Sequence, residues 1–223
     1  MAIAYNSSIV TSGLVLCVDA GNPRSYPGSG TQWNDATSSG FNFTLTNGPV
    51  YSSSNLGSFT FDGVNDFASA SDNTALNTQT PTVEVWVKTN ATTQNGFWFE
   101  KGSVNTQYAL FQEGGSITWR LTTNVGSLTA TTASFMSTSN WAQVVGTYTS
   151  GDRRIYVNGV QVASDALAYT IPTNSSGMFI GAYGTGTGYF YNGALSICRV
   201  YNRALSAAEV LQNFNATRGR YGI

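Results

Sequence analysis

Hydrophobic and polar residues alternate along many short stretches of the chain, the pattern of half-buried β-strands. In the stretch Thr82–Lys88 this alternation places Val83, Val85 and Val87 on one face of a strand. Residues 140–149 form a second long run rich in β-branched and aromatic residues. The two runs predict strands with at least one face in a hydrophobic core.

A tight hairpin is predicted where Asn158-Gly159 separates the runs 153–157 and 160–163, because both turn residues tolerate positive φ. Gly, Asn, Ser and Pro punctuate the rest of the chain in the same way. Further strands are predicted at 13–19, 58–62, 66–71, 97–101, 107–112, 116–123, 127–132, 178–183 and 193–201. About a dozen short strands predict an all-β, two-sheet antiparallel sandwich.

One helix is predicted, near the C-terminus. Ser206-Ala207-Ala208-Glu209 has the form of a capping box, and Val210, Leu211 and Phe214 follow it as an apolar stripe. Residues 20–57 are rich in glycine and proline, and we expect them to form a long ordered excursion over the sandwich.

Several segments, in this order, resemble the laminin G-like, concanavalin A-like lectin-glucanase superfamily. The resemblance rests on Gly13–Leu16 with Asp19-Ala20, Phe61–Phe67, Val83–Lys88, Trp141–Val144, Ile155–Gly159, Ile180-Gly181 and Gly193–Ser206. It implies a single jelly-roll domain over residues 1–223, with a core at about 13–214 and with the first and last strands adjacent. The opening segment from Asp19 to Trp33 resembles a version found in phage structural proteins.

The charge of the chain excludes some partners. Only 9% of the residues are charged, against roughly 25% in ordinary domains, and the net charge is −1. Without a basic patch, nucleic-acid binding is not expected. No apolar run is long enough to predict membrane insertion, and no signal peptide is recognisable at the N-terminus. We therefore expect a virion protein, with an extracellular protein as the alternative location.

The two cysteines, Cys17 and Cys198, each lie within an apolar run. Burial as two free thiols is the favoured interpretation, since cysteine is among the most buried residue types. A disulfide between the first and last strands is the alternative.

Catalysis is not expected. The chain has no histidine, which removes Ser-His-Asp and Cys-His chemistry. Its glutamates do not form the closely spaced pair that glycoside hydrolysis requires. These glutamates are Glu84, Glu100, Glu113 and Glu209. A glycosidase would require distant carboxylates, such as Glu100 and Glu113, to converge.

Two candidate sites emerge from the sequence. Asp62 and Asp66 bracket a short turn; their side chains either bond the turn backbone or, with Asp19, Asn22 or Asp35, bind calcium. The glycine-rich stretch 181–193 and the segment 97–99 supply aromatic rings that either cover a sheet or contact a ligand. The candidate ligand-binding residues are Tyr183, Tyr189, Phe190, Tyr191 and Trp98.

Three functions follow. The first is a non-enzymatic virion module, a phage capsid decoration protein or a head or tail appendage that contacts other virion proteins or copies of itself and attaches to host glycans. The second is a secreted or surface lectin that binds carbohydrate. The third is a glycoside hydrolase. We rank them in this order.

Overall fold

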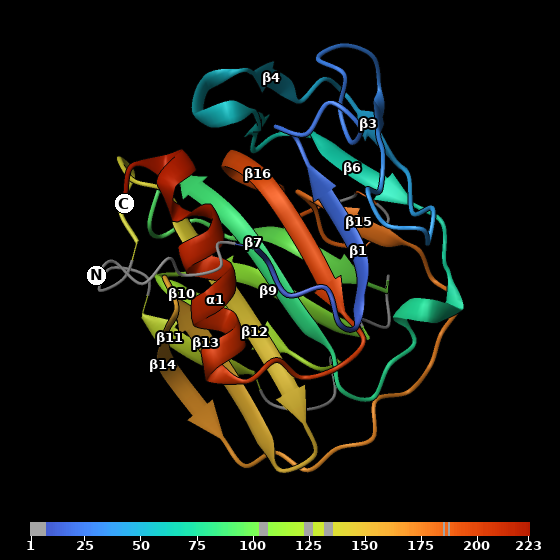
Figure 1. Ribbon diagram of the computed structural model, residues 1–223, viewed down its shortest axis with the longest axis vertical. Helices are drawn as coiled ribbons and strands as arrows, with labels where there is room; N and C mark the ends of the chain where they lie inside the picture. The colour runs from blue at the N-terminus through green and yellow to red at the C-terminus, as the bar shows by residue number, and fades with distance from the viewer. Residues whose placement is uncertain (1–7, 103–106, 123–126, 132–135, 185, 187) are drawn as a thin grey trace, which may run out of the picture.

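The computed structural model describes residues 8–102, 107–122, 127–131, 136–184, 186 and 188–223 (Figure 1). Its strands form two antiparallel sheets packed face to face, with one α-helix, α1 (Ala207–Thr217), against the outside of the first sheet. The predicted all-β sandwich with a short C-terminal helix is confirmed. Among the described residues, no helix is both long and apolar enough to cross a bilayer.

The first sheet, sheet A, is built around its last strand. Its strands are β1 (Leu14–Asp19), β4 (Val50–Ser52), β5 (Ser58–Asp62), β7 (Thr82–Thr89), β12 (Ala142–Thr149), β13 (Asp152–Val157), β14 (Val160–Asp165) and β16 (Asn192–Tyr201). The order across the sheet is β14-β13-β12-β7-β16-β5-β4, and β1 also pairs with β16. β16 therefore lies between β7 and β1 (Figure 1), and the predicted adjacency of first and last strands is confirmed.

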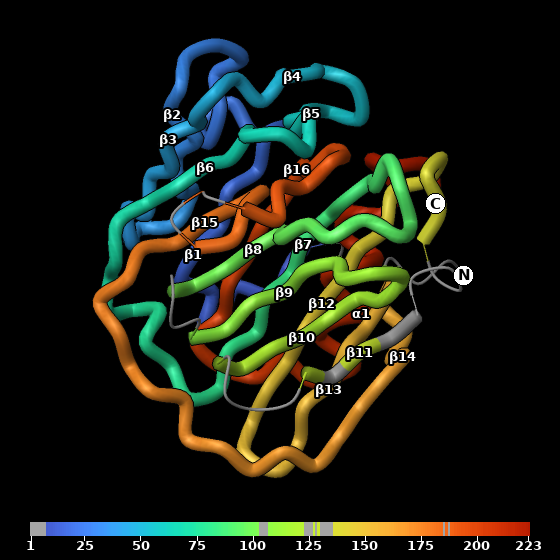
Figure 2. The backbone as a smooth tube through the Cα atoms, turned by 180° about the vertical axis from the view of Figure 1, so that it is seen from behind, coloured from blue at the N-terminus to red at the C-terminus, as the bar shows by residue number. Residues whose placement is uncertain are grey.

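The second sheet, sheet B, forms the other layer. Its strands are β2 (Gln32–Trp33), β3 (Phe43–Thr46), β6 (Phe67–Ala70), β8 (Gly96–Lys101), β9 (Tyr108–Glu113), β10 (Ser116–Arg120), β11 (Leu128–Thr131) and β15 (Met178–Ile180). They run in the order β11-β10-β9-β8-β15-β6-β3-β2. From behind, β8, β9 and β10 lie on the near side, with no described helix in front of them (Figure 2). No described helix therefore covers the outer face of sheet B at these strands, although outward side chains such as Phe97, Ala109 and Phe111 are buried.

The core lies between the sheets. Val83, Val85 and Val87 point into it from β7, as the alternation predicted. Trp119 of β10 spans the layers, and its indole N–H donates to the carbonyl of Thr147 on β12 at 3.1 Å. These contacts join the two sheets through a shared core.

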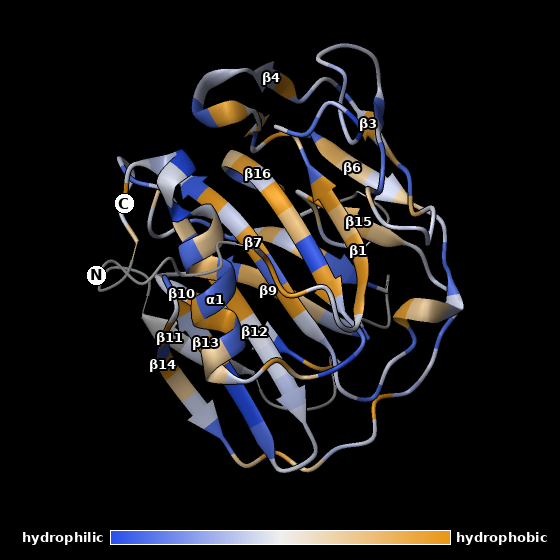
Figure 3. Ribbon diagram, in the orientation of Figure 1, coloured by the Kyte–Doolittle hydropathy of each residue, from blue (hydrophilic) through white to orange (hydrophobic). Residues whose placement is uncertain are grey.

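Helix α1 packs against part of the outer face of sheet A. The predicted capping box is present, with Ser206 and Glu209 bonding each other's backbone. Val210 and Phe214 are buried, as predicted, but Leu211 is exposed and does not belong to the apolar stripe. In Figure 3 the helix carries both hydrophobic and hydrophilic residues, as expected of a helix on the surface of a sheet.

A buried polar network lies between α1 and sheet A. Glu84 of β7 accepts hydrogen bonds from Arg199 of β16 at 2.8 Å and from Asn213 of α1 at 2.7 Å. Gln143 of β12 donates to the same carboxylate at 3.0 Å. Because a buried carboxylate is costly unless it is paired and hydrogen-bonded, this network fixes the position of the helix.

The two cysteines are free and buried. Cys17 pairs in register with Arg199, and Cys198 pairs with Val18. Since neighbouring residues of a strand point to opposite faces, Cys198 lies in the core between the sheets and Cys17 lies on the outer face. Burial raises the pKa of both thiols. The favoured prediction of two buried free thiols is confirmed, and the alternative of a disulfide is not.

Residues 20–57 contain more regular structure than predicted. The excursion supplies β2 and β3 to sheet B and β4 to sheet A. These strands are only two to four residues long, too short for a periodic pattern. The predicted strand at 178–183 is also shorter, since β15 ends at Ile180. The predicted strand ends at 123 and 132 lie outside the described residues.

Candidate functional site

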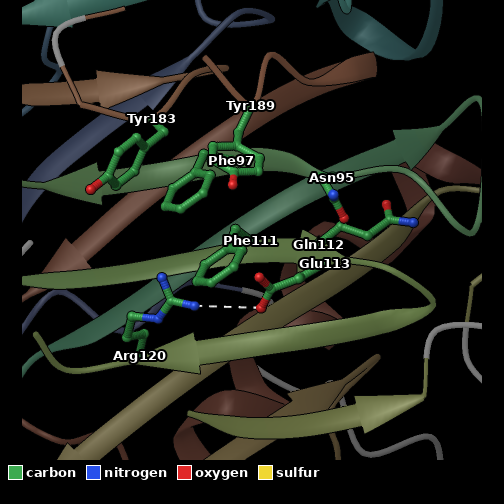
Figure 4. A pocket seen from close by; sticks show the side chains of 8 residues that line it. All are labelled: Asn95, Phe97, Phe111, Gln112, Glu113, Arg120, Tyr183 and Tyr189. Atoms are coloured by element: carbon green, nitrogen blue, oxygen red, sulfur yellow. Dashed lines mark hydrogen bonds and ion pairs between the residues drawn. The ribbon is translucent and has the colours of Figure 1, made fainter. Parts of the chain in front are cut away.

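A pocket of about 260 Å³ lies on the outer face of sheet B (Figure 4). Strands β8, β9 and β10 and the loop after β15 provide its walls. The residues that line it are Asn95, Phe97, Phe111, Gln112, Glu113, Arg120, Tyr183 and Tyr189. We call this the outer pocket. It combines aromatic rings with amide, carboxylate, guanidinium and hydroxyl groups.

Two phenylalanines lie at the base of the pocket, and only 3% of the surface of Phe97 and 2% of that of Phe111 is accessible. Phe97 of β8 and Phe111 of β9 are partners in the antiparallel register. Their rings stack with centroids 4.2 Å apart and planes within 4°. A bulge between Phe97 and Phe99 makes this possible, because the extra residue lets Phe97 face outward while both Trp98 and Phe99 enter the core.

A guanidinium continues the stack. The side chain of Arg120 from β10 lies over the other side of Phe111, 4.5 Å from the ring centroid. Its Nε donates to the hydroxyl of Ser127 at 3.1 Å, and its Nη2 is 3.4 Å from a carboxylate oxygen of Glu113. Figure 4 shows this ion pair at the edge of the pocket, across from Tyr183 and Tyr189.

The loop after β15 is anchored by backbone hydrogen bonds. The amide of Tyr183 donates to the carbonyl of Gly188 at 3.0 Å, and Phe97 donates to the carbonyl of Tyr189 at 3.1 Å. The amide of Gly184 donates to the buried carboxylate of Glu100 at 2.5 Å. These bonds tie the loop to β8 and place the two tyrosines beside Phe97.

Tyr189 is the most exposed aromatic residue of the pocket, with 54% of its surface accessible. Its φ is +48°, a left-handed conformation that a tyrosine rarely adopts. Its ring lies 6.1 Å from that of Phe97 and 5.8 Å from that of Tyr183. The fold thus holds the Tyr189 ring outward at the rim of the pocket, although tyrosine prefers a negative φ.

The structure brings together only part of the predicted ligand-binding set. Tyr183 and Tyr189 line the outer pocket, whereas the half-buried Phe190 does not. Trp98 and Tyr191 are fully buried, with ring centroids 6.3 Å apart, so they cannot contact a ligand on the surface. Burial raises the pKa of Tyr191 well above its ordinary value.

Most of the pocket residues were not predicted to bind a ligand. Phe111 and Arg120 lie in predicted strands, but neither strand register nor the outward face follows from a single sequence. Glu113 follows the predicted strand 107–112 and was considered only as a carboxylate for hydrolysis. The segment 97–99 indicated the correct strand, β8, but Trp98 was predicted to contact the ligand, whereas Phe97 lines the pocket. The sequence signal was the uninterrupted aromatic triplet, and the bulge, which is not visible in that pattern, selects Phe97 as the outward residue.

The family model of the concanavalin A-like lectin/glucanases superfamily matches residues 62–211, more than half of the chain. The chain belongs to this superfamily. Among curated proteins, no sequence matches the chain.

Solved structures of the superfamily fold agree with this assignment. Domain 4 of AbnA, an extracellular arabinanase from Geobacillus stearothermophilus in complex with arabinotriose, has a TM-score of 0.72 and 17% identity over 91% of this chain and 98% of its own. The binding domain of Paraclostridial Mosquitocidal Protein 1 has a TM-score of 0.70 and 15% identity over 92% of this chain and 52% of its own.

The binding domain of botulinum neurotoxin DC in complex with SialylT has a TM-score of 0.71 and 11% identity over 92% of this chain and 52% of its own. This chain therefore spans about half of either toxin binding domain. At these identities the likeness shows the fold that the proteins share.

The turn at Asp62–Asp66 is held by its own side chains. Asp62 accepts from the amides of Val64 at 2.8 Å and Asn65 at 3.3 Å, and Asp66 accepts from the amide of Asp62 at 3.1 Å. The bonds from the backbone, that from Val64 first, lower the pKa of Asp62, whereas burial raises the pKa of Asp66. The turn carries the chain from β5 in sheet A to β6 in sheet B.

The three carboxylates predicted for calcium do not share a site. Both oxygens of Asp19 accept from Arg220, at 2.9 and 2.8 Å. Asp19 faces Ile197 of β16 and Asp62 faces Asn192, a separation of about 16 Å along that strand. Within the described part of the chain, no three Asp, Glu or Cys side chains gather to hold a metal. The residues present do not fit a calcium site built on Asp19, Asp62 and Asp66.

The glutamates proposed for hydrolysis do not converge. Glu100 is fully buried and bonds the Gly184 amide, whereas Glu113 is half exposed at the outer pocket. Glu100 faces Ala109 of β9, four residues from Glu113, or about 13 Å along the strand. Two-carboxylate glycosidases place both carboxyl groups beside the scissile bond, a position that the buried Glu100, bonded to a loop amide, does not occupy.

Proposed function

We propose that the chain is a glycan-binding, lectin-like module without catalytic activity, and that the outer pocket is its sugar site. A single observation carries the proposal: Tyr189 is held outward, in a left-handed conformation, beside the stacked Phe97 and Phe111 and opposite the polar pair of Arg120 and Glu113. A sugar ring needs both features, an aromatic surface for its C–H groups and polar partners for its hydroxyls.

The comparisons support this class of ligand. The arabinanase domain is in complex with arabinotriose, and one toxin binding domain is in complex with SialylT. The burial of Glu100, whose carboxylate accepts from the Gly184 amide, favours binding without hydrolysis. The virion setting predicted from the sequence, with other virion proteins or a second copy as partners, stays a prediction.

A glycan panel with two matched variants tests the proposal. The wild-type protein should be retained by a defined subset of immobilised glycans. Tyr189→Ala should weaken that binding about tenfold, since an aromatic contact of about 1.4 kcal/mol corresponds to one factor of ten. Phe190→Ala removes the neighbouring ring, which lies outside the pocket, and should leave binding unchanged.

The proposal fails if the wild-type protein binds no glycan on a broad panel. It also fails if Tyr189→Ala and Phe190→Ala reduce binding equally, because the effect would then come from the loop as a whole. Thermal unfolding of both variants serves as the folding control.

A further inference from the structure

The ion pair in the outer pocket differs from the other arginine pairs of the described residues. Elsewhere the guanidinium meets its carboxylate closely: Arg154–Asp152 at 2.6 Å, Arg199–Glu84 at 2.8 Å, Arg203–Glu209 at 2.6 Å, Arg220–Asp19 at 2.8 Å, and Arg153 with Asp165. In several of these, two guanidinium nitrogens donate to the two carboxylate oxygens, as in the Arg154–Asp152 and Arg203–Glu209 pairs. Arg120 approaches Glu113 at one atom only, at 3.4 Å.

This contact is weak, and the guanidinium does not depend on it for its position. Half of the Glu113 side chain is exposed, and exposed ion pairs contribute little stability. Arg120 is instead held by its stack on Phe111 and by the hydrogen bond from Nε to Ser127. A preorganised guanidinium with a loosely bound partner can exchange that partner for another anion at small cost.

The planar guanidinium fork matches a carboxylate, which it can bind through two parallel hydrogen bonds. We propose that the outer pocket selects a sugar that carries a carboxylate, and that this group replaces Glu113 on Arg120 while the sugar ring contacts Tyr189. The inference rests on the proposed function. The pocket, at about 260 Å³, lies near the lower end of ligand sites, so it takes one terminal acidic sugar.

The experiment compares sugars that differ in one group. Methyl glycosides of glucuronic acid and glucose, and of galacturonic acid and galactose, are titrated calorimetrically into the wild-type protein, with galactose 6-sulfate as a second anion. The acidic sugar of the preferred pair should bind at least about tenfold more tightly than its neutral partner, and less tightly as salt is added. The sulfated sugar should bind more weakly than the carboxylate.

Four variants separate the contributions. Arg120→Met keeps an apolar contact with Phe111 and should abolish the preference for the acidic sugar. Arg120→Lys keeps the positive charge but loses the planar guanidinium, and it should retain only part of the preference for the acidic sugar. Glu113→Gln removes the competing carboxylate and should raise the ratio of acidic to neutral affinity. Arg154→Lys, on the other sheet, is the matched control and should leave that ratio as in the wild type.

The outcomes distinguish this inference from the proposed function. If acidic and neutral sugars bind equally and Arg120→Met weakens both alike, the pocket binds sugars without selecting a carboxylate, and this inference is wrong. Stronger binding of the sulfate would overturn the choice of carboxylate. If no sugar of the panel or the pairs binds, the proposed function and this inference fail together.

Discussion

At the scale of single residues, Tyr189 shows how the fold imposes a conformation on the site. The left-handed region costs a non-glycine residue about 1–2 kcal/mol, and Tyr189 occupies it at φ +48°. The hydrogen bond from Phe97 to its carbonyl and the packing of the loop against β8 hold it there. Such strain is typical of residues kept in place for a function.

Comparing Tyr189→Gly with Tyr189→Ala isolates this strain, because both variants lose the ring and only alanine keeps the backbone penalty. We expect the glycine variant to be more stable than the alanine variant by about 1 kcal/mol, with sugar binding equally weak in both. Urea unfolding gives the two free energies. A glycine variant less stable than the alanine variant would show that the left-handed conformation is not strained.

Arg199 and Glu84 form a buried ion pair in which each charge needs the other for the fold to be stable. Its side chain and that of Glu84 are almost completely inaccessible and lie 2.8 Å apart. Arg199→Met should lower the free energy of unfolding by about 3–5 kcal/mol, since it leaves a buried carboxylate without its counter-ion. The double variant Glu84→Gln/Arg199→Met should recover part of the loss, measured by the same urea titration. Equal loss in the single and double variants would contradict this account.

At the scale of elements, helix α1 depends on a cap that responds to pH. Glu209 bonds the backbone of Ser206 and pairs with Arg203 at 2.6 Å. The hydrogen bond from Arg203 is the main cause that lowers the pKa of Glu209 from 4.5 to about 2. A lowered pKa means that the ionised form stabilises the fold.

The contribution of Glu209 is therefore complete above its ordinary pKa of 4.5 and is lost as the pH falls to about 2. We expect the wild type to be more stable than Glu209→Gln at about pH 6, and the difference to shrink toward about pH 2. Chemical unfolding of both proteins at several pH values measures it. A difference that does not vary with pH would mean that the cap acts without its charge.

Elements with a clear period could be predicted from the sequence, and those without one could not. β7, with three valines on one face, and the hairpin of β13 and β14 follow from alternation and from Asn158-Gly159. β2, at two residues, leaves no such pattern. Of the predicted ligand-binding residues, only Tyr183 and Tyr189 line the outer pocket. Phe111 and Arg120 are placed there by the pairing of their strands, which depends on contacts between residues distant in sequence.

At the scale of the whole molecule, the two faces of the sandwich differ. Helix α1 packs against part of the outer face of sheet A, whereas no described helix covers sheet B where the outer pocket lies (Figures 1 and 2). The superfamily fold followed from the order of its segments, because the segments that carry the resemblance coincide with the strands of the core. The ligand did not follow, since a shared fold leaves the surface residues free to differ.

Removal of divalent metal should leave the fold intact. Arg220 occupies the carboxylate of Asp19, and the turn at Asp62–Asp66 is closed by its own hydrogen bonds. We expect the thermal midpoint to be the same with EDTA as with added calcium. A shift of several degrees on chelation would show a calcium site that these residues do not account for, and Asp62→Asn would then be the first variant to prepare.

The central position of β16 has a consequence for synthesis on the ribosome. This strand is the last described strand in the chain, yet β1, β5 and β7 all pair with it. Until residue 201 leaves the exit tunnel, β1, β5 and β7 lack the neighbour that β16 provides in the folded sheet. Sheet A is thus completed only after β16 has emerged, and a chain that stops before β16 exposes strand edges of the kind that favour aggregation.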